Sequence, residues 1–367
     1  MPTPSRHPVG LVLTPYETYV VERTRAAVAQ RRNDLPATMK ALEAALATGQ
    51  ASKEDETRLA EAIVGLAHAV KDAQTVLRWA GRYIELDGPS DAVRLLRIQA
   101  QLDTGDVEGA KTALQARVEA ADQAGRTLPE VQLRLLVGAQ QRTKDPGLAR
   151  TLERLAVAYP RPEYWLAVIS PVTRDPALDD RALLNLFRLL RATNNLNRAD
   201  LRDEMAQRAQ RLGQPGEALA IVEEGFASGQ FGTGAGAADQ QKLREQLGRL
   251  AAVDRNDRPA AEAAARKAPD GNGLVDLGWA LVASQPAGAA ASALEPGLAL
   301  IEQGIAKGGL RRPAEARLQL AIAQLAAGRK DAARQTLAAA SATDGLAAVV
   351  RLWALWAQAP AMLPPRN

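Results

Sequence analysis

Apolar positions along the chain recur with a helical period, and a small residue recurs in step with them. In nine places this residue, an alanine, stands about five positions after a helix-breaking turn, and an apolar helix follows. These positions are Ala37, Ala73, Ala110, Ala149, Ala182, Ala218, Ala261, Ala299 and Ala333. Neighbouring members are 33 to 43 residues apart, about 37 on average. A repeat of that length without a strand pattern predicts stacked helical hairpins.

The turns divide the chain into predicted hairpins. The first joins helices over 16–31 and 35–47, and later hairpins span 90–124, 129–159 and 199–228. A final helix over 345–358 is expected to cover the open end of the array, as terminal repeats do. The predicted fold is therefore all-α, a right-handed solenoid of about nine helical hairpins with a C-terminal capping helix. An array in which each repeat packs only on its neighbours is expected to be elongated and monomeric.

The predicted domain organisation is a single superhelical array over 14–358. Residues 1–13 and 359–367 are proline-containing stretches without a helical period, and we interpret them as tails. Two irregular stretches, a Gly-rich loop over 229–236 and an insertion over 285–296, are expected to be surface loops between helices. Because the alanine after each turn faces the partner helix, Ala110, Ala218 and Ala333 are predicted to be buried.

The composition narrows the class of protein. Apolar residues make up 47% of the chain and aromatic residues only 4%, which suits close helix–helix packing. There is no cysteine and no apolar run long enough for a membrane span. Lys and Arg outnumber Asp and Glu by 46 to 42, with both signs interspersed along the helices. The start lacks the pattern of a signal peptide, so we expect either a cytoplasmic protein or an export signal upstream of Met1.

Groups able to do chemistry are few. The two histidines, His7 and His68, have no cysteine to join them, so an ordinary zinc site is not expected. The glycine run over 232–236 lacks the Lys-Ser/Thr ending of a phosphate-binding loop, and no strand precedes it. We therefore predict no catalytic activity, no metal and no cofactor. The five tryptophans are expected to pack between helices.

The residues also resemble the tetratricopeptide repeat (TPR) family. Leu277-Gly278 stands at the family's Leu-Gly position, and Ala299 to Ala333 has its 34-residue spacing. The stretches over 14–17, 159–165 and 301–309 are similar to a group of exported, uncharacterised TPR proteins of proteobacteria. That resemblance implies a periplasmic scaffold for protein–protein interaction.

A TPR-like array implies that a protein or peptide binds in a concave groove lined by the first helices of the hairpins. Candidate contacts are Asp203, Gln207, Gln210, Leu318 and Ile322. The Lys-plus-Asn pair with which some TPR domains clamp a terminal carboxylate is absent from the corresponding positions. The alternative is a helical-repeat nucleic-acid-binding protein, suggested by the cluster of Arg23, Arg25, Arg31 and Arg32. No aromatic residues interleave with that cluster, and we expect no nucleic acid as partner.

Overall fold

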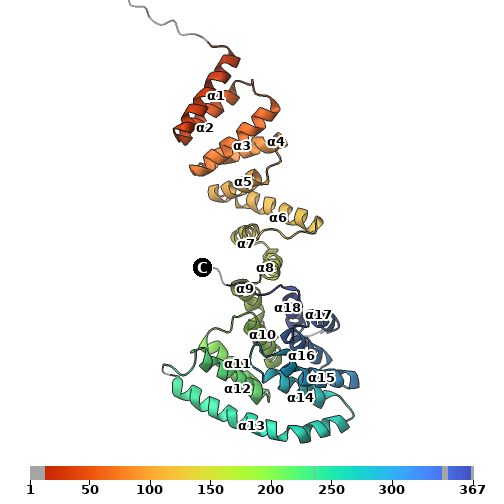
Figure 1. Ribbon diagram of the computed structural model, residues 1–367. Coiled ribbons are helices and arrows are strands. Elements are labelled where there is room, and N and C mark those ends of the chain that lie inside the picture. Colours follow the sequence, from red (N-terminus) through yellow and green to blue (C-terminus); the bar gives the residue numbers. More distant parts are fainter. Residues whose placement is uncertain (1–12, 235, 341–345, 365–367) are drawn as a thin grey trace, which may run out of the picture. The chain divides into compact units, whose positions relative to one another are not determined.

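The computed structural model describes residues 13–234, 236–340 and 346–364, which form 18 α-helices and no strand (Figure 1). The all-α fold built from consecutive helical hairpins is confirmed. The packing divides the chain after Leu148 into two compact units, and each is described by itself. The first unit contains α1 (Pro15–Arg31), α2 (Leu35–Ala47), α3 (Lys53–Ala69), α4 (Ala73–Glu85), α5 (Asp91–Thr104), α6 (Val107–Gln123) and α7 (Glu130–Thr143).

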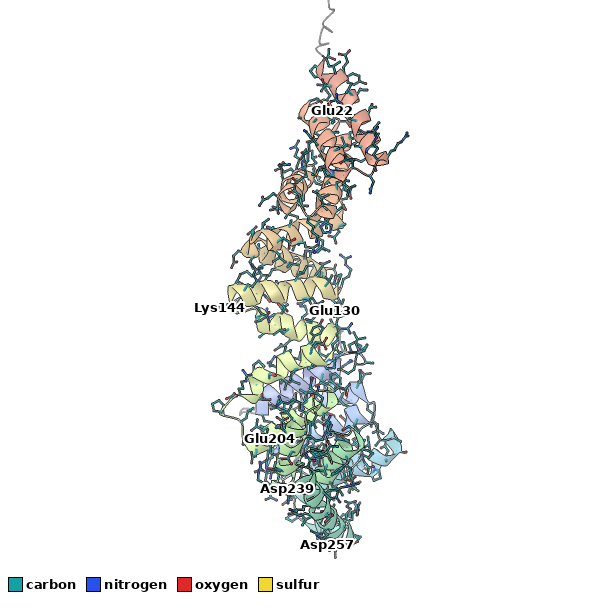
Figure 2. All side chains as sticks on the ribbon, turned by 90° about the vertical axis from the view of Figure 1, so that its left-hand side faces the viewer. Glu22, Glu130, Lys144, Glu204, Asp239 and Asp257 are labelled. Carbon is teal, nitrogen blue, oxygen red and sulfur yellow. The ribbon has the colours of Figure 1, made fainter. Side chains whose placement is uncertain are left out.

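The second unit contains the remaining helices. They are α8 (Leu148–Ala158), α9 (Pro162–Thr173), α10 (Asp180–Ala192), α11 (Ala199–Arg211), α12 (Pro215–Ala227), α13 (Ala237–Lys267), α14 (Asn272–Ala283), α15 (Ala291–Lys307), α16 (Pro313–Ala326), α17 (Lys330–Ala338) and α18 (Leu346–Gln358). Charged residues cover the solvent side of these helices, as Figure 2 shows for Glu204 on α11 and Asp257 on α13.

The predicted turns have a common geometry at five of the hairpins. Each turn contains a residue with positive φ, and the next residue is the N-cap of the second helix. The position five after the left-handed residue then falls at the fourth residue of the helix, on the side that packs on the partner. The pairs are Asn33 with Thr38, Lys71 with Val76, Gly105 with Ala110, Gly213 with Ala218 and Gly328 with Ala333, and all five second members are buried.

The predicted burial of Ala110, Ala218 and Ala333 is confirmed, because each is 0% exposed. The same prediction of register is wrong elsewhere. Ala37 and Ala73 are only partly buried, since α2 and α4 begin at Leu35 and Ala73 and place Thr38 and Val76 inward instead. Three further members of the series are exposed, namely Ala149, Ala261 and Ala299.

The exposure of Ala261 follows from the largest departure from the predicted fold. A hairpin was expected there, but α13 is one continuous helix of 31 residues that passes through Pro259. α13 packs on α12 at one side and on α14 at the other. A single helix in place of a hairpin shifts the alternation of first and second helices for the rest of the chain.

The last helix does not simply cover an open end. α18 packs on α16 and α17, its neighbours in sequence, and also on α9 and α10. The Trp353 indole donates a hydrogen bond of 3.1 Å to the carbonyl of Asn185, 168 positions earlier. The rings of Trp165 on α9 and Trp356 on α18 meet edge to face with centroids 5.2 Å apart. Helices α9–α18 therefore form a closed turn. α18 covers the end of the array on α16 and α17, as expected of a capping helix, and also packs on α9 and α10.

Parts of the two irregular stretches pack as regular structure does. In the Gly-rich stretch, Phe231 is 2% exposed and packs edge to face on Phe226, with ring centroids 6.0 Å apart. The second stretch, expected over 285–296, is shorter, because α15 already begins at Ala291 and includes Pro296. Seven residues, 284–290, form the connection between α14 and α15.

Candidate functional site

The inner wall of the closed turn is built from every second helix. α12 packs on α14, α14 on α16, α16 on α18, and α18 on α10. Because α13 is a single helix and not a hairpin, this wall contains the second helices of two hairpins, α10 and α12, and the first helices of two later hairpins, α14 and α16. α18 completes the wall. The prediction of a groove lined only by first helices is therefore wrong for this unit.

A cavity of about 340 Å³ opens on this wall. We call it the tryptophan pocket, because Trp279, Trp353 and Trp356 contribute to its lining. Aliphatic side chains complete the apolar part, and the connection between α14 and α15 forms one rim. The aliphatic members are Val282, Leu294, Ile322 and Leu325. A pocket of this size and lining can take up one large apolar side chain.

The floor of the tryptophan pocket holds a buried ion pair. Arg188 on α10 donates two hydrogen bonds to Glu217 on α12, of 2.8 and 2.6 Å, and their side chains are 5% and 1% exposed. The guanidinium also bonds to Asn185 Oδ1 at 2.6 Å and to Gln214 Oε1 at 2.7 Å. It lies over the Trp279 ring at 4.4 Å from the centroid. These bonds use four of the five guanidinium N–H groups, so the pair is a fixed element of the wall.

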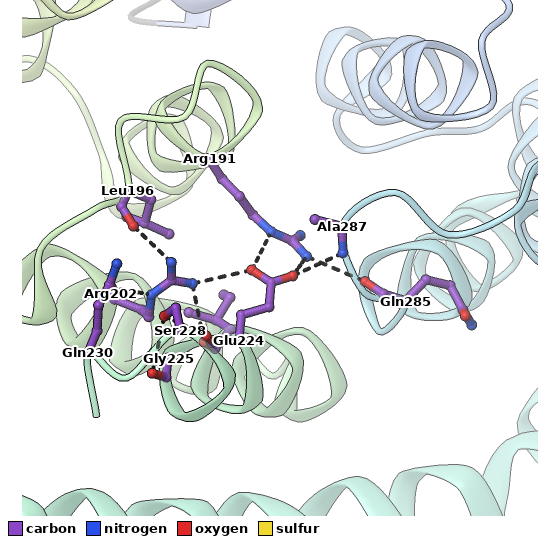
Figure 3. Close-up of polar contacts among 10 residues, drawn as sticks. Arg191, Leu196, Arg202, Glu224, Gly225, Ser228, Gln230, Gln285 and Ala287 are labelled. Carbon is purple, nitrogen blue, oxygen red and sulfur yellow. Dashed lines mark hydrogen bonds and ion pairs between the residues drawn. The ribbon is translucent and has the colours of Figure 1, made fainter. Parts of the chain in front are cut away.

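A second network fixes the rim (Figure 3). Glu224 on α12 accepts hydrogen bonds from Arg191 on α10, one of them at 3.1 Å, and pairs with Arg202 at 3.2 Å. Its other oxygen accepts the backbone N–H of Ala287 at 3.0 Å. One carboxylate thus joins α10, α11 and the connection between α14 and α15. Arg191 also reaches the carbonyl of Gln285 at 3.5 Å, and both residues line the pocket.

The electrostatics of Glu224 follow from these contacts. Burial alone would raise the pKa of this carboxyl, but the hydrogen bonds and charge of Arg191, the Ala287 N–H and the charge of Arg202 together lower it. Glu224 is therefore ionised near neutral pH. Burial lowers the pKa of Arg202, which the charge of Glu224 opposes. The network holds opposite charges in place and offers no group poised for proton transfer.

The predicted site residues fall into two groups. Asp203, Gln207 and Gln210 lie on α11, which contributes nothing to the tryptophan pocket. Gln207 is exposed and donates a hydrogen bond of 2.7 Å to Asp203. Burial raises the pKa of Asp203, although the hydrogen bond from Gln207 acts to lower it. On α16, Leu318 is 0% exposed and so presents no surface to a partner, whereas Ile322 lines the tryptophan pocket. The five residues do not converge on one site.

Sequence reasoning missed the polar part of the site. Arg188, Arg191, Glu217 and Glu224 resemble ordinary charges of a helix surface in the sequence. The closed turn buries Arg188 and Glu217 and partly buries Arg191 and Glu224. The tryptophans were a usable signal. Trp165, Trp279 and Trp353 are buried between helices as predicted, yet Trp279 and Trp353 also line the cavity, which packing alone does not imply.

Within the described ranges, no group of three or more acidic or histidine side chains is arranged to hold a metal ion. His68 is exposed on α3. Over the same residues, no helix combines the length and apolar character that crossing a bilayer requires.

The arrangement of hairpins defines the chain as a helical-repeat protein. No protein-family model and no curated protein matches the sequence. Among solved structures, it aligns with a tetratricopeptide repeat protein from Parabacteroides merdae ATCC 43184 at 11% identity and a TM-score of 0.31, covering 92% of this chain and 98% of that one.

Two further solved structures align with the chain at low similarity. One is Naa15/Naa10 bound to HypK-THB, at 12% identity and a TM-score of 0.33, covering 93% of this chain and 62% of that one. The other is the P58(IPK) TPR domain, at 13% identity and a TM-score of 0.23, covering 93% and 97%. At such values the assignment as a helical repeat rests on the helices of this chain.

Proposed function

We propose that the chain is a non-catalytic protein-binding scaffold whose tryptophan pocket takes an apolar side chain from a partner polypeptide. The observation that carries the proposal is the 340 Å³ cavity on the inner wall, lined by three tryptophans and four aliphatic side chains. Full burial of one large apolar side chain contributes about 1.5–3 kcal/mol. One anchor of this kind gives a partner segment a fixed position on the wall.

The polar rim suggests how the partner's main chain is held. Arg191 and Gln285 lie beside the apolar lining, and Glu224 fixes both the Arg191 guanidinium and the connection that carries Gln285. Groups that are already held in place lose little conformational freedom when a ligand binds. Main-chain carbonyls and amides of a bound segment would meet these groups. Specificity would then come from the single side chain in the pocket.

The exposed Gln207 and the partly buried Asp203 and Gln210 of α11 belong to the proposal as a separate contact. Asp203, Gln207 and Gln210 lie on a different helix from the pocket, so a partner touching both would have to extend beyond the inner wall. We propose Ile322 as the only one of the five sequence-predicted residues that meets the anchoring side chain. Leu318 is left out, because it is buried in the core.

A library of random peptides selected on the purified full-length chain tests the proposal. Selected peptides are expected to share one large apolar or aromatic residue and to change the fluorescence of the pocket tryptophans. Ala326→Trp fills the pocket from an exposed position on α16 and is expected to weaken binding at least tenfold. Ala299→Trp, at an exposed position of α15 outside the pocket, is the matched control. Peptides without an apolar consensus, or equal binding by both variants, would contradict the proposal.

We further propose that the scaffold acts in the bacterial envelope, where the group of proteins that it resembles is exported. The support is that resemblance alone. Fractionation of the native cells, followed by immunodetection of the chain, tests the location. Recovery with cytoplasmic markers would overturn the location and leave the binding proposal standing.

A further inference from the structure

A second cavity in the same unit, of about 130 Å³, lies where α10, α14 and α16 begin. We call it the arginine pocket. Its polar lining comprises Arg181, Asn272, Asp276, Arg311, Arg312 and Gln319, together with the carboxylate of Glu315. The volume is about ten times the roughly 10–15 Å³ that one water molecule needs. The cavity therefore has room for a small polyatomic ligand.

The arginine pocket is lined by more arginine side chains than carboxylates, so its positive charge is only partly neutralised. Arg181 and Arg312 share the single carboxylate of Glu315, at 3.6 and 3.8 Å, which is beyond hydrogen-bond distance. The Arg311 side chain makes no hydrogen bond or ion pair with any described residue. Three guanidiniums thus line the cavity with donors still available.

The position of Arg311 is fixed by its backbone. Its N–H donates to Asn272 Oδ1 at 3.0 Å, and the Asn272 amide donates to the carbonyl of Gly309 at 3.2 Å. These two bonds tie the segment before α16 to the first residue of α14. The first N–H of α14, that of Asn272, donates to the Asp270 carboxylate at 3.0 Å. α16 begins without a side-chain cap, so the free N–H groups of its first turn add positive potential at this end.

Gln319 is an independent sign of a ligand. This residue on α16 is 5% exposed and lines the arginine pocket, yet its side-chain amide has no hydrogen-bond partner among the described residues. The polar atoms of the Gln319 side chain are not completely enclosed by protein, so a molecule in the cavity can reach them. Buried amides in folded proteins nearly always have a partner. A ligand in the cavity would supply one.

We propose that the arginine pocket binds a phosphate group, held by the three guanidiniums and the Gln319 amide. The lining carries three positive and two negative side chains, and the uncapped N-terminus of α16 adds about half a charge. The resulting surplus of roughly 1.5 matches a phosphate, which carries about −1.5 to −2 near pH 7. A guanidinium is planar and can donate two parallel N–H···O hydrogen bonds to two oxygens of one phosphate. This site is separate from the tryptophan pocket and does not depend on the function proposed for it.

Calorimetric titration of the full-length chain with inorganic phosphate, at constant ionic strength set with sodium chloride, tests the site. We expect saturable binding at one site per chain. Arg311→Gln and Gln319→Leu should each weaken it at least fivefold. Arg317→Gln removes one positive charge from α16 outside the pocket and should leave the dissociation constant within twofold.

Further ligands decide what the pocket recognises. Phenyl phosphate that binds as well as inorganic phosphate would identify the monoester group as the ligand, whereas weaker binding would identify the free ion, and both support a phosphate site. Tighter binding of succinate than of either would overturn the phosphate assignment. Equal weakening by Arg317→Gln and Arg311→Gln would show a general charge effect and also overturn it. Far-ultraviolet circular dichroism of each variant confirms that the helices are intact.

Discussion

The guanidinium of Arg188 and the carboxylate of Glu217 form a bidentate ion pair that is almost fully buried, with N–O distances of 2.8 and 2.6 Å. The two residues are 29 positions apart and join α10 to α12 on the inner wall. Buried pairs contribute less than their Coulomb attraction suggests, because both ions lose hydration. Removing one partner is nevertheless costly, since it leaves the other charge buried and alone.

Glu217→Ala is therefore expected to destabilise the second unit by about 3–5 kcal/mol. Replacing both partners, Arg188→Leu with Glu217→Leu, should recover part of that loss, because no uncompensated charge remains. Urea unfolding followed by tryptophan fluorescence measures both, since four of the five tryptophans belong to this unit. Glu223→Ala on the same helix, which breaks the half-exposed pair with Arg244, is the control and should change stability little. An effect of Glu217→Ala no larger than the control would contradict the assigned burial.

Ala218→Leu is expected to cost roughly 1–3 kcal/mol, because Ala218 is fully enclosed between packed helices and three further carbon atoms have no space. Ala299→Leu, at an exposed position of α15, should stay within about 0.5 kcal/mol of the parent. The midpoints of urea unfolding compare the two. Similar midpoints for both variants would show that the register of the hairpins is misassigned.

Gly278→Ala is expected to destabilise α14 although alanine is the better helix former. A Cβ at Gly278 would lie 2.6 Å from the Gly297 carbonyl oxygen and 2.8 Å from the Ile301 nitrogen, both backbone atoms of α15. The helices would have to separate, at a cost of roughly 1–3 kcal/mol. Gly248→Ala on α13 meets no atom within 4 Å and should instead stabilise by about 0.5–1 kcal/mol. Thermal unfolding of both variants should shift in opposite directions, and shifts of the same sign would refute the close crossing.

Glu224→Gln tests the rim network through its pH dependence. The folded pKa of Glu224 lies below the usual value of 4.5, so the ionised carboxylate stabilises the fold in full above that value. The contribution should decline below about pH 4.5 and vanish as the pH falls through the lower folded pKa. The difference in unfolding free energy between parent and variant is therefore expected to be constant near neutral pH and to shrink on acidification. A difference that grows on acidification would have the wrong sign and contradict the network.

Much of the fold follows from local sequence, because helix ends are local events. Gly105 adopts positive φ, Asp106 caps the Gly109 N–H at 2.9 Å, and Ala110 then faces inward. The left-handed turn residue, the cap and the buried alanine all lie within about one helical turn of each other, so the repeat and these buried alanines could be predicted from sequence. Ala149 fails this rule because the turn after Lys144 is longer and α8 begins only at Leu148, which puts Thr151 inward.

The site itself was decided by long-range packing. The sequence offers a proline at 259 and a repeat spacing that both favour a hairpin, yet α13 continues through Pro259 and packs on α12 and α14. That one helix exchanges the roles of first and second helices, which moves the pocket away from Asp203 and Gln207. Closure by α18 on α10 then buries Arg188 and Glu217, whose charges are indistinguishable in sequence from those of an exposed surface. Local sequence thus determined the helices and their turns, whereas burial of the site required contacts between helices far apart in the chain, which no local pattern encodes.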